Sequence, residues 1–400
     1  MIQTSQFSLN EARGYQSFDH EVVPILDRIC MGLEITPEMF KQAEKRYQSI
    51  TDYLCEEGTS MAKYQPWLYP QGSANLGLTV KPDYDNEFDV DVICQLILAN
   101  RPTQEAFINI LFDRLKQRGI YTLRRMNRCV RVQYANEFHI DITPAIPDDI
   151  LGPQNIKVTD KEIGRWKDSN PLDYATWFKA IAQFVPRIIY SDRVLMEAHA
   201  SVEPLPAPTL SRPLLNRIIQ LLKRHRDLMF EGDKNAPISA IITTLAAKSY
   251  AFHAVREHVS MVHFIRRVVT DIPHFITKAD GEESVPNPAN PFENYADKWR
   301  TKPERQKAFH LWHGAAIDHF NSLLASLNVG KQELFESLSA AYGEKNVKGA
   351  VTAVAEARRI LTENRQLGVS KATGFVAPIV GTYQVGQNVL PVRDHTNFGC

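Results

Sequence analysis

Three aspartates are spaced so that two strands would bring their carboxylates together. In FDVDV at 88–92, Asp89 and Asp91 alternate with apolar residues, and in HIDIT at 139–143 Asp141 does the same. A strand turns alternate side chains to opposite faces, so Asp89 and Asp91 share one face, ~6.6 Å apart at the backbone. Three such carboxylates repel one another unless a divalent cation lies between them. Magnesium suits this arrangement, because it takes oxygen ligands and leaves coordination positions for nucleotide phosphates.

A glycine and a serine upstream supply the second half of a phosphate site. Gly72 and Ser73 follow Gln71 in a loop that leaves an apolar stretch, and Gly77 comes four residues after the serine. A tight turn there aims backbone N–H groups and the Ser73 hydroxyl at a triphosphate. The alternative is a set of surface aspartates beside an ordinary turn. It is disfavoured because the Gly-Ser pair, the Asp-x-Asp strand and the third aspartate occur together.

These residues resemble those of the DNA polymerase β-like nucleotidyltransferases and, within that superfamily, the cGAS/DncV-like nucleotidyltransferases (CD-NTases) of bacterial anti-phage CBASS systems. The resemblance covers most of the chain between about residues 60 and 300. Four more segments carry it: GRWKDSNPLDYATWF at 164–178, LLKRHRD at 221–227, PISAIITTLAA at 237–247 and NPANPFENYADKW at 287–299. Leu78 departs from the family pattern, in which a threonine often follows the glycine. Thr79 is the candidate to take the role of that threonine.

The resemblance implies an α+β fold. It consists of a polymerase β-like nucleotidyltransferase core, with a mixed sheet and flanking helices, plus a helical C-terminal lobe, and the active site lies in the cleft between them. We expect N-terminal bracing helices at 1–60, the core at 61–202, the helical lobe at 203–364 and a flexible tail at 365–400. The four prolines between 203 and 213 mark the boundary into the lobe, and the tail has little apolar surface to bury.

The elements that position the aspartates are also predicted from the sequence. A short helix is expected at 20–33, and Thr36 begins a second helix that runs to about residue 57. A third helix runs between Thr103 and Gly119. A strand pair follows, at 121–135 and 137–146, with its turn at Asn136 and Glu137. This pairing would place the third aspartate beside the other two.

Three further residues are candidates for nucleotide binding. Arg131 alternates with Val130 and Val132 and pairs across the turn near Asp141, where a guanidinium can hold phosphates. A solvated arginine on an edge strand is the alternative. By resemblance, Lys223 in the basic helix at 212–230 would meet the donor triphosphate, although it could instead be a surface lysine. Also by resemblance, Ser239 would add a hydroxyl at a helix N-terminus, where anions bind readily.

The resemblance implies template-independent phosphoryl transfer between nucleoside triphosphates, with ATP among them, that ends in a cyclic di- or trinucleotide second messenger. Asp89 and Asp91 would hold two Mg²⁺ ions, for which Mn²⁺ can substitute. Asp141 would ligate one ion and help the acceptor hydroxyl lose its proton. The alternative enzyme is a linear nucleotidyltransferase, resembling an oligoadenylate synthetase or transferring AMP to RNA or protein. A non-enzymatic partner with a decayed site is disfavoured by the intact triad.

The composition restricts the partners. The 46 lysines and arginines equal the 46 aspartates and glutamates, which favours small nucleotides over an extended nucleic acid. The five cysteines lack CxxC spacing, and the histidines have no evident acidic or thiol neighbours with which to bind zinc. With no apolar run of ~18 residues and no signal peptide, we expect a cytoplasmic protein without a membrane partner. By resemblance, E1- and E2-like enzymes would conjugate the tail at its Gly399-Cys400 end.

Overall fold

The computed structural model describes residues 9–81, 88–97, 101–119, 122–134, 138–152, 154–162, 164–188, 212–326, 330–363, 367–370, 376–378 and 389–391. The predicted turn at Asn136 and Glu137 lies outside these residues, as does Cys400.

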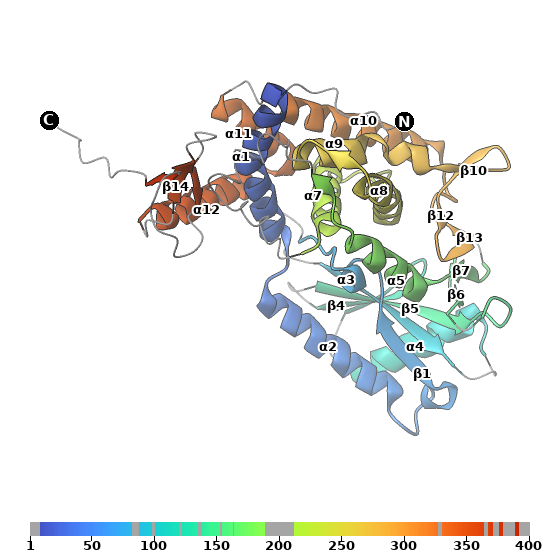
Figure 1. Cartoon of the computed structure of the whole chain (residues 1–400). Helices are drawn as coiled ribbons and strands as arrows, with labels where there is room; N and C mark the ends of the chain where they lie inside the picture. The colour runs from blue at the N-terminus through green and yellow to red at the C-terminus, as the bar shows by residue number, and fades with distance from the viewer. Residues whose placement is uncertain are drawn as a thin grey trace.

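A mixed seven-stranded sheet forms the lower half of the molecule in Figure 1. Five strands follow the order β1-β2-β5-β4-β3, and β6 joins β5 to β7. Strand β2 pairs with β5 in parallel, and the other neighbours are antiparallel. The strands are β1 (Pro66–Pro70), β2 (Asp89–Leu96), β3 (Thr122–Arg125), β4 (Val130–Tyr134), β5 (Phe138–Pro147), β6 (Ile156–Val158) and β7 (Lys167–Ser169).

Helices make up most of the upper half, around α7 and α8 (Figure 1). The helices are α1 (Leu9–Leu33), α2 (Pro37–Cys55), α3 (Gly72–Leu76), α4 (Gln104–Arg118), α5 (Pro171–Ala182), α7 (Leu214–Met229), α8 (Ser239–Ala254), α9 (Met261–Thr270), α10 (Pro303–Ala325), α11 (Lys331–Tyr342) and α12 (Glu344–Glu363), with 3-10 turns η1 (Ala62–Tyr64) and η2 (Ile272–Phe275). This mixed sheet with flanking helices and a helical C-terminal part confirms the predicted fold class.

Small strand pairs lie outside the main sheet. They are β8 (Arg187–Ile188) with β9 (Glu257–His258), β10 (Thr277–Ala279) with β11 (Glu282–Ser284), β12 (Pro286–Asn287) with β13 (Asn290–Asn294), and β14 (Leu367–Ser370) with β15 (Val376–Pro378) and β16 (Val389–Pro391). The last three strands fall in the segment predicted to be a flexible tail, and the flexibility of the rest of that segment stays a prediction.

Local sequence signals account for the helix ends. The Thr36 hydroxyl accepts a hydrogen bond from the Met39 N–H at 3.2 Å, and Thr103 does the same for Ala106 at 3.3 Å, which satisfies amides that a helix leaves open at its start. Gly119 ends α4 with φ 67°. The first helix begins at Leu9 and is therefore longer than the predicted 20–33, and Pro24 lies within it without ending it.

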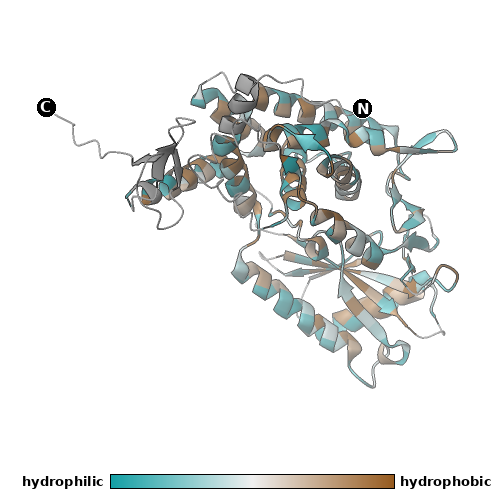
Figure 2. Ribbon diagram, in the orientation of Figure 1, coloured by the Kyte–Doolittle hydropathy of each residue, from teal (hydrophilic) through white to brown (hydrophobic). Residues whose placement is uncertain are grey.

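Two separate hydrophobic cores lie on either side of the site. One core joins α1, α5 and the helices from α7 onward, and its largest fully buried side chain is Trp312. The other joins the sheet to α2 and α4, whose Leu54 and Phe107 are buried against the strands. In Figure 2 the outer face of α2 is mainly hydrophilic, while much of the central sheet is apolar. The candidate site lies between these two cores.

The described residues include no helix both long enough and apolar enough to cross a membrane.

Candidate functional site

The predicted strand pairing places two of the aspartates side by side. Strand β2 runs parallel to β5 in a register that puts Asp91 opposite Asp141. Asp89 shares the Asp91 face of β2, while Val90 and Val92 are 8% and 0% exposed on the other face. The alternation inferred from the sequence is therefore the one that the strands adopt.

The Gly-Ser turn packs directly on the end of β2. The backbone N–H of Gln71 donates to the Asp91 carbonyl oxygen at 2.9 Å, and Gly72 and Ser73 then begin the single helical turn α3. Gly72 has φ +58°, and a Cβ at this position would lie 2.7 Å from Oδ2 of Asp91. Only glycine allows this backbone conformation and this approach together.

Arg131 is held by the carboxylates themselves. It lies opposite Asp141 in the β4–β5 register, and its Nε and Nη2 donate to the two Asp141 oxygens at 2.8 and 2.7 Å. Nη2 also lies 3.5 Å from Oδ1 of Asp89. The predicted position near Asp141 is thus correct. In this structure, however, the guanidinium binds the carboxylate, and phosphate binding by Arg131 stays a prediction.

Electrostatics at Asp91 fits a site for a cation. Burial, together with the neighbouring Asp141 and Asp89 carboxylates, raises the pKa of this carboxyl to about 7, against the lowering effect of Lys223 and Arg131. A carboxylate made costly in this way is stabilised by added positive charge, and hard oxygen donors are what Mg²⁺ prefers. Within the described residues, no three acidic, histidine or cysteine side chains are already grouped to hold a metal ion. Arg131 would have to release Asp141 before all three aspartates could serve.

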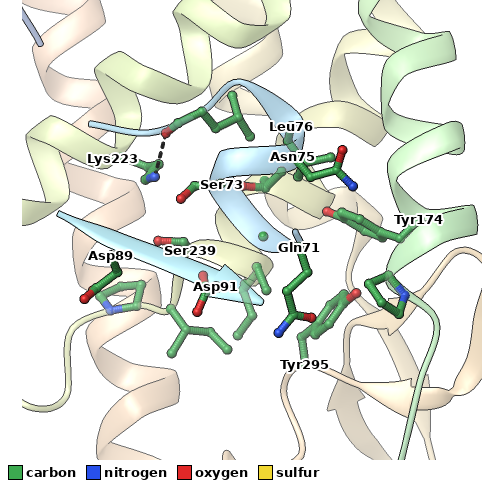
Figure 3. A pocket seen from close by; sticks show the side chains of 18 of the residues that line it. Gln71, Ser73, Asn75, Leu76, Asp89, Asp91, Tyr174, Lys223, Ser239 and Tyr295 are labelled. Carbon is green, nitrogen blue, oxygen red and sulfur yellow. Dashed lines mark hydrogen bonds between the residues drawn. The ribbon is translucent and has the colours of Figure 1, made fainter. Parts of the chain in front are cut away.

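Lys223 comes from the helical half and binds the turn that follows α3. Its Nζ donates to the Leu78 carbonyl oxygen at 2.8 Å (dashed in Figure 3). The side chain is buried, and burial lowers the pKa of the ammonium to about 8. A lysine N–H₃⁺ has three donors, so two remain for phosphate oxygens.

Asn216 of α7 and Arg212, which precedes the helix, bind the same turn at two more carbonyls. Asn216 Nδ2 donates to Leu76 O at 2.8 Å and to Gly77 O at 3.3 Å, and Arg212 Nη1 donates to Gly77 O at 3.2 Å. Gly77 has φ +67°, and a Cβ there would lie 2.7 Å from Arg212 Nη1. The helical half thus fixes the end of the turn whose beginning lies on β2.

A cavity of about 660 Å³ collects most of the predicted residues, a size usual for small-ligand sites. The predicted residues that line it are Gln71, Gly72, Ser73, Asp89, Asp91, Lys223 and Ser239. Figure 3 shows Ser73, Asp91 and Ser239 grouped around its centre, with Lys223 beside them. Asp141 and Arg131 are not among the lining residues; Asp141 is paired beside Asp91 and binds Arg131.

Comparisons with known proteins agree with this geometry. The family model of the Second Messenger Oligonucleotide or Dinucleotide Synthetase domain matches residues 15–181. A c-di-GMP synthase of Roseivirga ehrenbergii is 26% identical over 94% of this chain and 96% of its own. The cyclic dinucleotide synthase CdnG of Bradyrhizobium diazoefficiens is 25% identical over 94% of each chain. The domain at residues 15–181 belongs to the CD-NTase family.

A solved structure shows that the CD-NTase fold extends over most of the chain. The structure of Bradyrhizobium diazoefficiens CdnG in complex with GTP aligns with a TM-score of 0.63 and 20% identity, and covers 85% of this chain and 100% of that one. This alignment confirms the fold, while the family model and the two relatives confirm the family predicted from the sequence motifs.

The sequence left several lining residues of this CD-NTase without a role. Tyr174 is buried, with its hydroxyl 2.9 Å from that of Thr244. It also lines the cavity, as does Tyr295, whose ring meets it edge-on with 5.9 Å between centroids. Tyr295 lies within the 287–299 segment that carried the resemblance, so the segment was the available signal.

The far rim of the cavity joins the two halves by ion pairs. Lys167 of β7 pairs with Asp297, and Glu162 accepts from Lys298 at 2.5 Å and from Lys302 at 3.3 Å. Long-range pairs such as these have no signature in the local sequence, which explains why the prediction missed them.

Proposed function

We propose that this CD-NTase is a template-independent nucleotidyltransferase that joins nucleoside triphosphates into a cyclic di- or trinucleotide second messenger for anti-phage signalling. The observation that carries the proposal is the register of β2 and β5, which sets Asp91 beside Asp141 and next to the Gly72-Ser73 turn. The printed names of the two relatives, a c-di-GMP synthase and a cyclic dinucleotide synthase, support a cyclic product. They also make GTP, together with ATP, the triphosphate to test first.

The donor triphosphate would bind between the turn and the helical half. Ser73 offers a hydroxyl at the base of the cavity, while Lys223 and Ser239 offer an ammonium and a second hydroxyl from α7 and α8. Such preorganised donors lose little freedom when the nucleotide arrives, so they serve mainly to orient the α-phosphorus.

The carboxylates would act on the opposite side of that phosphorus. Asp89, Asp91 and Asp141 are the residues that would hold two Mg²⁺ ions, or Mn²⁺ in their place. When bound, these ions neutralise the attacking and leaving oxygens of an in-line displacement. Asp141 would also help the acceptor ribose hydroxyl lose its proton as its oxygen bonds to the α-phosphorus and pyrophosphate leaves. Arg131 would then pass from Asp141 to a phosphate oxygen, a move that its two terminal nitrogens permit.

A product assay tests the proposal. The purified protein is incubated with Mg²⁺ or Mn²⁺ and the four ribonucleoside triphosphates, alone and mixed, and then treated with phosphatase before mass spectrometry. A phosphatase-resistant nucleotide that disappears in Asp89→Ala is the expected result. A product that phosphatase degrades, or an adenylated RNA or protein, would contradict cyclisation and would identify the linear transferase instead.

We also propose that the C-terminal tail is a substrate for E1- and E2-like conjugating enzymes. The proposal rests on the family resemblance and on the Gly399-Cys400 end, which lies outside the described residues. Co-expression with such enzymes should give a covalent adduct that survives a denaturing gel and is lost on deletion of Cys400. Persistence of the adduct after that deletion would exclude the end of the tail as the attachment point.

A further inference from the structure

Arg226 joins the end of α7 to the start of α8 in the wall of the cavity. Its Nη1 donates to the Pro237 carbonyl oxygen at 2.7 Å and lies 3.1 Å from Oγ of Ser239, to which it also donates. Pro237 and Ser239 flank Ile238, the N-cap of α8, and both line the cavity together with Arg226. One guanidinium nitrogen thus fixes both the turn and the serine hydroxyl that it presents.

The guanidinium is held from its other side by Asp227. Nε of Arg226 donates to Oδ1 of Asp227 at 2.7 Å, and Nη2 lies 2.6 Å from the same oxygen. The Arg226 side chain is 12% exposed and that of Asp227 is 40% exposed. A planar guanidinium with partners on two edges has one orientation, which a lysine ammonium in its place would not have.

This arrangement decides what the Ser239 hydroxyl can do. A hydroxyl has one proton to donate and two lone pairs that accept, whereas a guanidinium only donates. Ser239 must therefore accept from Arg226, which leaves its own proton for a partner in the cavity. Ile238, the N-cap of α8, provides no side-chain acceptor for the first amides of this 16-residue helix, so the same place also offers helix N–H groups to an anion.

Lys223 lies on the same face of α7 as Arg226, because residues three apart on a helix are neighbours. Lys223 keeps a full ammonium charge for phosphate, but most of the charge of Arg226 is matched by Asp227. Arg226 is therefore suited to orienting Ser239, and Lys223 to direct electrostatic attraction.

We propose that Arg226 is a positioning residue for the triphosphate: it fixes the Ser239 hydroxyl as a hydrogen-bond donor to a phosphate oxygen. The inference rests on the proposed function and deepens it, since it concerns how the same cavity recognises phosphate. It requires that Arg226 and Ser239 contribute to phosphate binding as one unit, so that loss of either removes the contribution of both.

A double-mutant cycle on binding tests this demand. Affinity for a non-hydrolysable GTP or ATP analogue, whichever binds the native protein more tightly, is measured by calorimetry with Mg²⁺ for Ser239→Ala, Arg226→Lys and the double variant. The two single variants are each expected to lose about tenfold in affinity, a usual value for one hydrogen bond to a charged group. The double variant should lose no more than either single one. Binding of the corresponding nucleoside, which has no phosphate, should not change.

Three outcomes would overturn the proposal: a double variant that loses about a hundredfold, an Arg226→Lys variant that binds like the native protein, and a native protein that binds the analogue no better than the nucleoside. Arg266→Lys, on the outer face of α9 where its partner is Asn321, is the matched control and should change nothing. Binding is read without turnover, so a native protein that binds but yields no nucleotide product would refute the proposed function and leave the cycle valid.

Asp227→Asn provides a second route that keeps the arginine and does not depend on the stability of Arg226→Lys. Loosening the guanidinium should weaken analogue binding about threefold in the native background. In the Ser239→Ala background it should have no effect, because Arg226 would have nothing left to position. An equal loss in both backgrounds would contradict the proposal.

Discussion

The two walls of the cavity are built in different ways. The acidic wall is a product of backbone pairing, since strand alternation sets Asp89 and Asp91 in the wall and the β2–β5 register sets Asp141 beside Asp91. The basic wall depends on side chains that reach across from another part of the chain, such as Lys223 to the Leu78 carbonyl and Arg226 to Pro237. The positions of the carboxylates are set by the backbone hydrogen bonds of the sheet. The positions of the cationic groups depend on individual side-chain hydrogen bonds to distant carbonyls.

The largest expected effect comes from breaking the acidic wall. Asp91→Ala should lower product formation at least about a thousandfold, because no other group replaces its charge. The fold should survive, since the raised pKa of Asp91 shows that its charge is costly where it lies. Asp113→Ala, on the exposed face of α4, is the control and should retain full activity. Substantial turnover by Asp91→Ala, measured as pyrophosphate release, would refute the role given to this wall.

The junction between the walls is tested at Gly72. Gly72→Ala adds a Cβ 2.7 Å from Oδ2 of Asp91 at φ +58°, so turnover should fall about a hundredfold as the carboxylate is displaced. Gly58→Ala has a similar φ of +76° with nothing within 4 Å of the added atom. It should carry the backbone strain of roughly 1–2 kcal/mol and keep its activity. Equal losses in the two variants would show that strain, and not the contact with Asp91, is responsible.

Removing the buried charge of the basic wall should make the protein more stable and weaken its binding of the triphosphate. Lys223→Met removes an ammonium whose pKa burial lowers to about 8, so at pH 7 the folded state no longer holds a buried charge. The free energy of unfolding should rise by roughly 1–3 kcal/mol, while KM for the triphosphate increases ten- to a hundredfold. Lys278→Met, on the exposed strand β10, should change neither. A Lys223→Met protein that is less stable and binds normally would reverse the contrast between the walls.

The smallest effect is expected where α7 grips the turn. Asn216→Ala removes the donors to Leu76 O and Gly77 O, at a cost of about 1–3 kcal/mol for the two carbonyls left buried. KM should rise about threefold because the turn keeps its bond to β2 and its contact with Lys223. Asn321→Ala, at the surface of α10, is the matched amide. An unchanged KM together with the expected loss of stability would show that the grip is structural only.

The sequence indicated residues of both walls, but it indicated the arrangement only of the acidic wall, for a physical reason. Asp89, Asp91 and Asp141 carry their own alternation, and the partner of a strand lies at a regular spacing. The positive φ of Gly72 could be expected because glycine is the residue type that adopts it most readily. The bond from Arg226 to Ser239 spans 13 residues and those from α7 to the turn span more than a hundred, and nothing in the local pattern around either partner indicates them. Arg131 is the intermediate case: its neighbour Asp141 was predicted, but the choice of carboxylate over phosphate depends on whether a nucleotide is present.

The turn at 72–78 has a mechanical consequence. Its first peptide is bonded to β2, its last three carbonyls are bonded to α7, and the side chains of Leu76 and Leu78 lie in the core of the helical half. The turn is therefore bonded to both halves, and these bonds resist hinged rotation of one half on the other at this end of the cavity. At the far rim the two halves are joined by the partly exposed ion pairs of Glu162 and Lys167, for which water can compete, so these contacts resist separation of the halves less than the turn does.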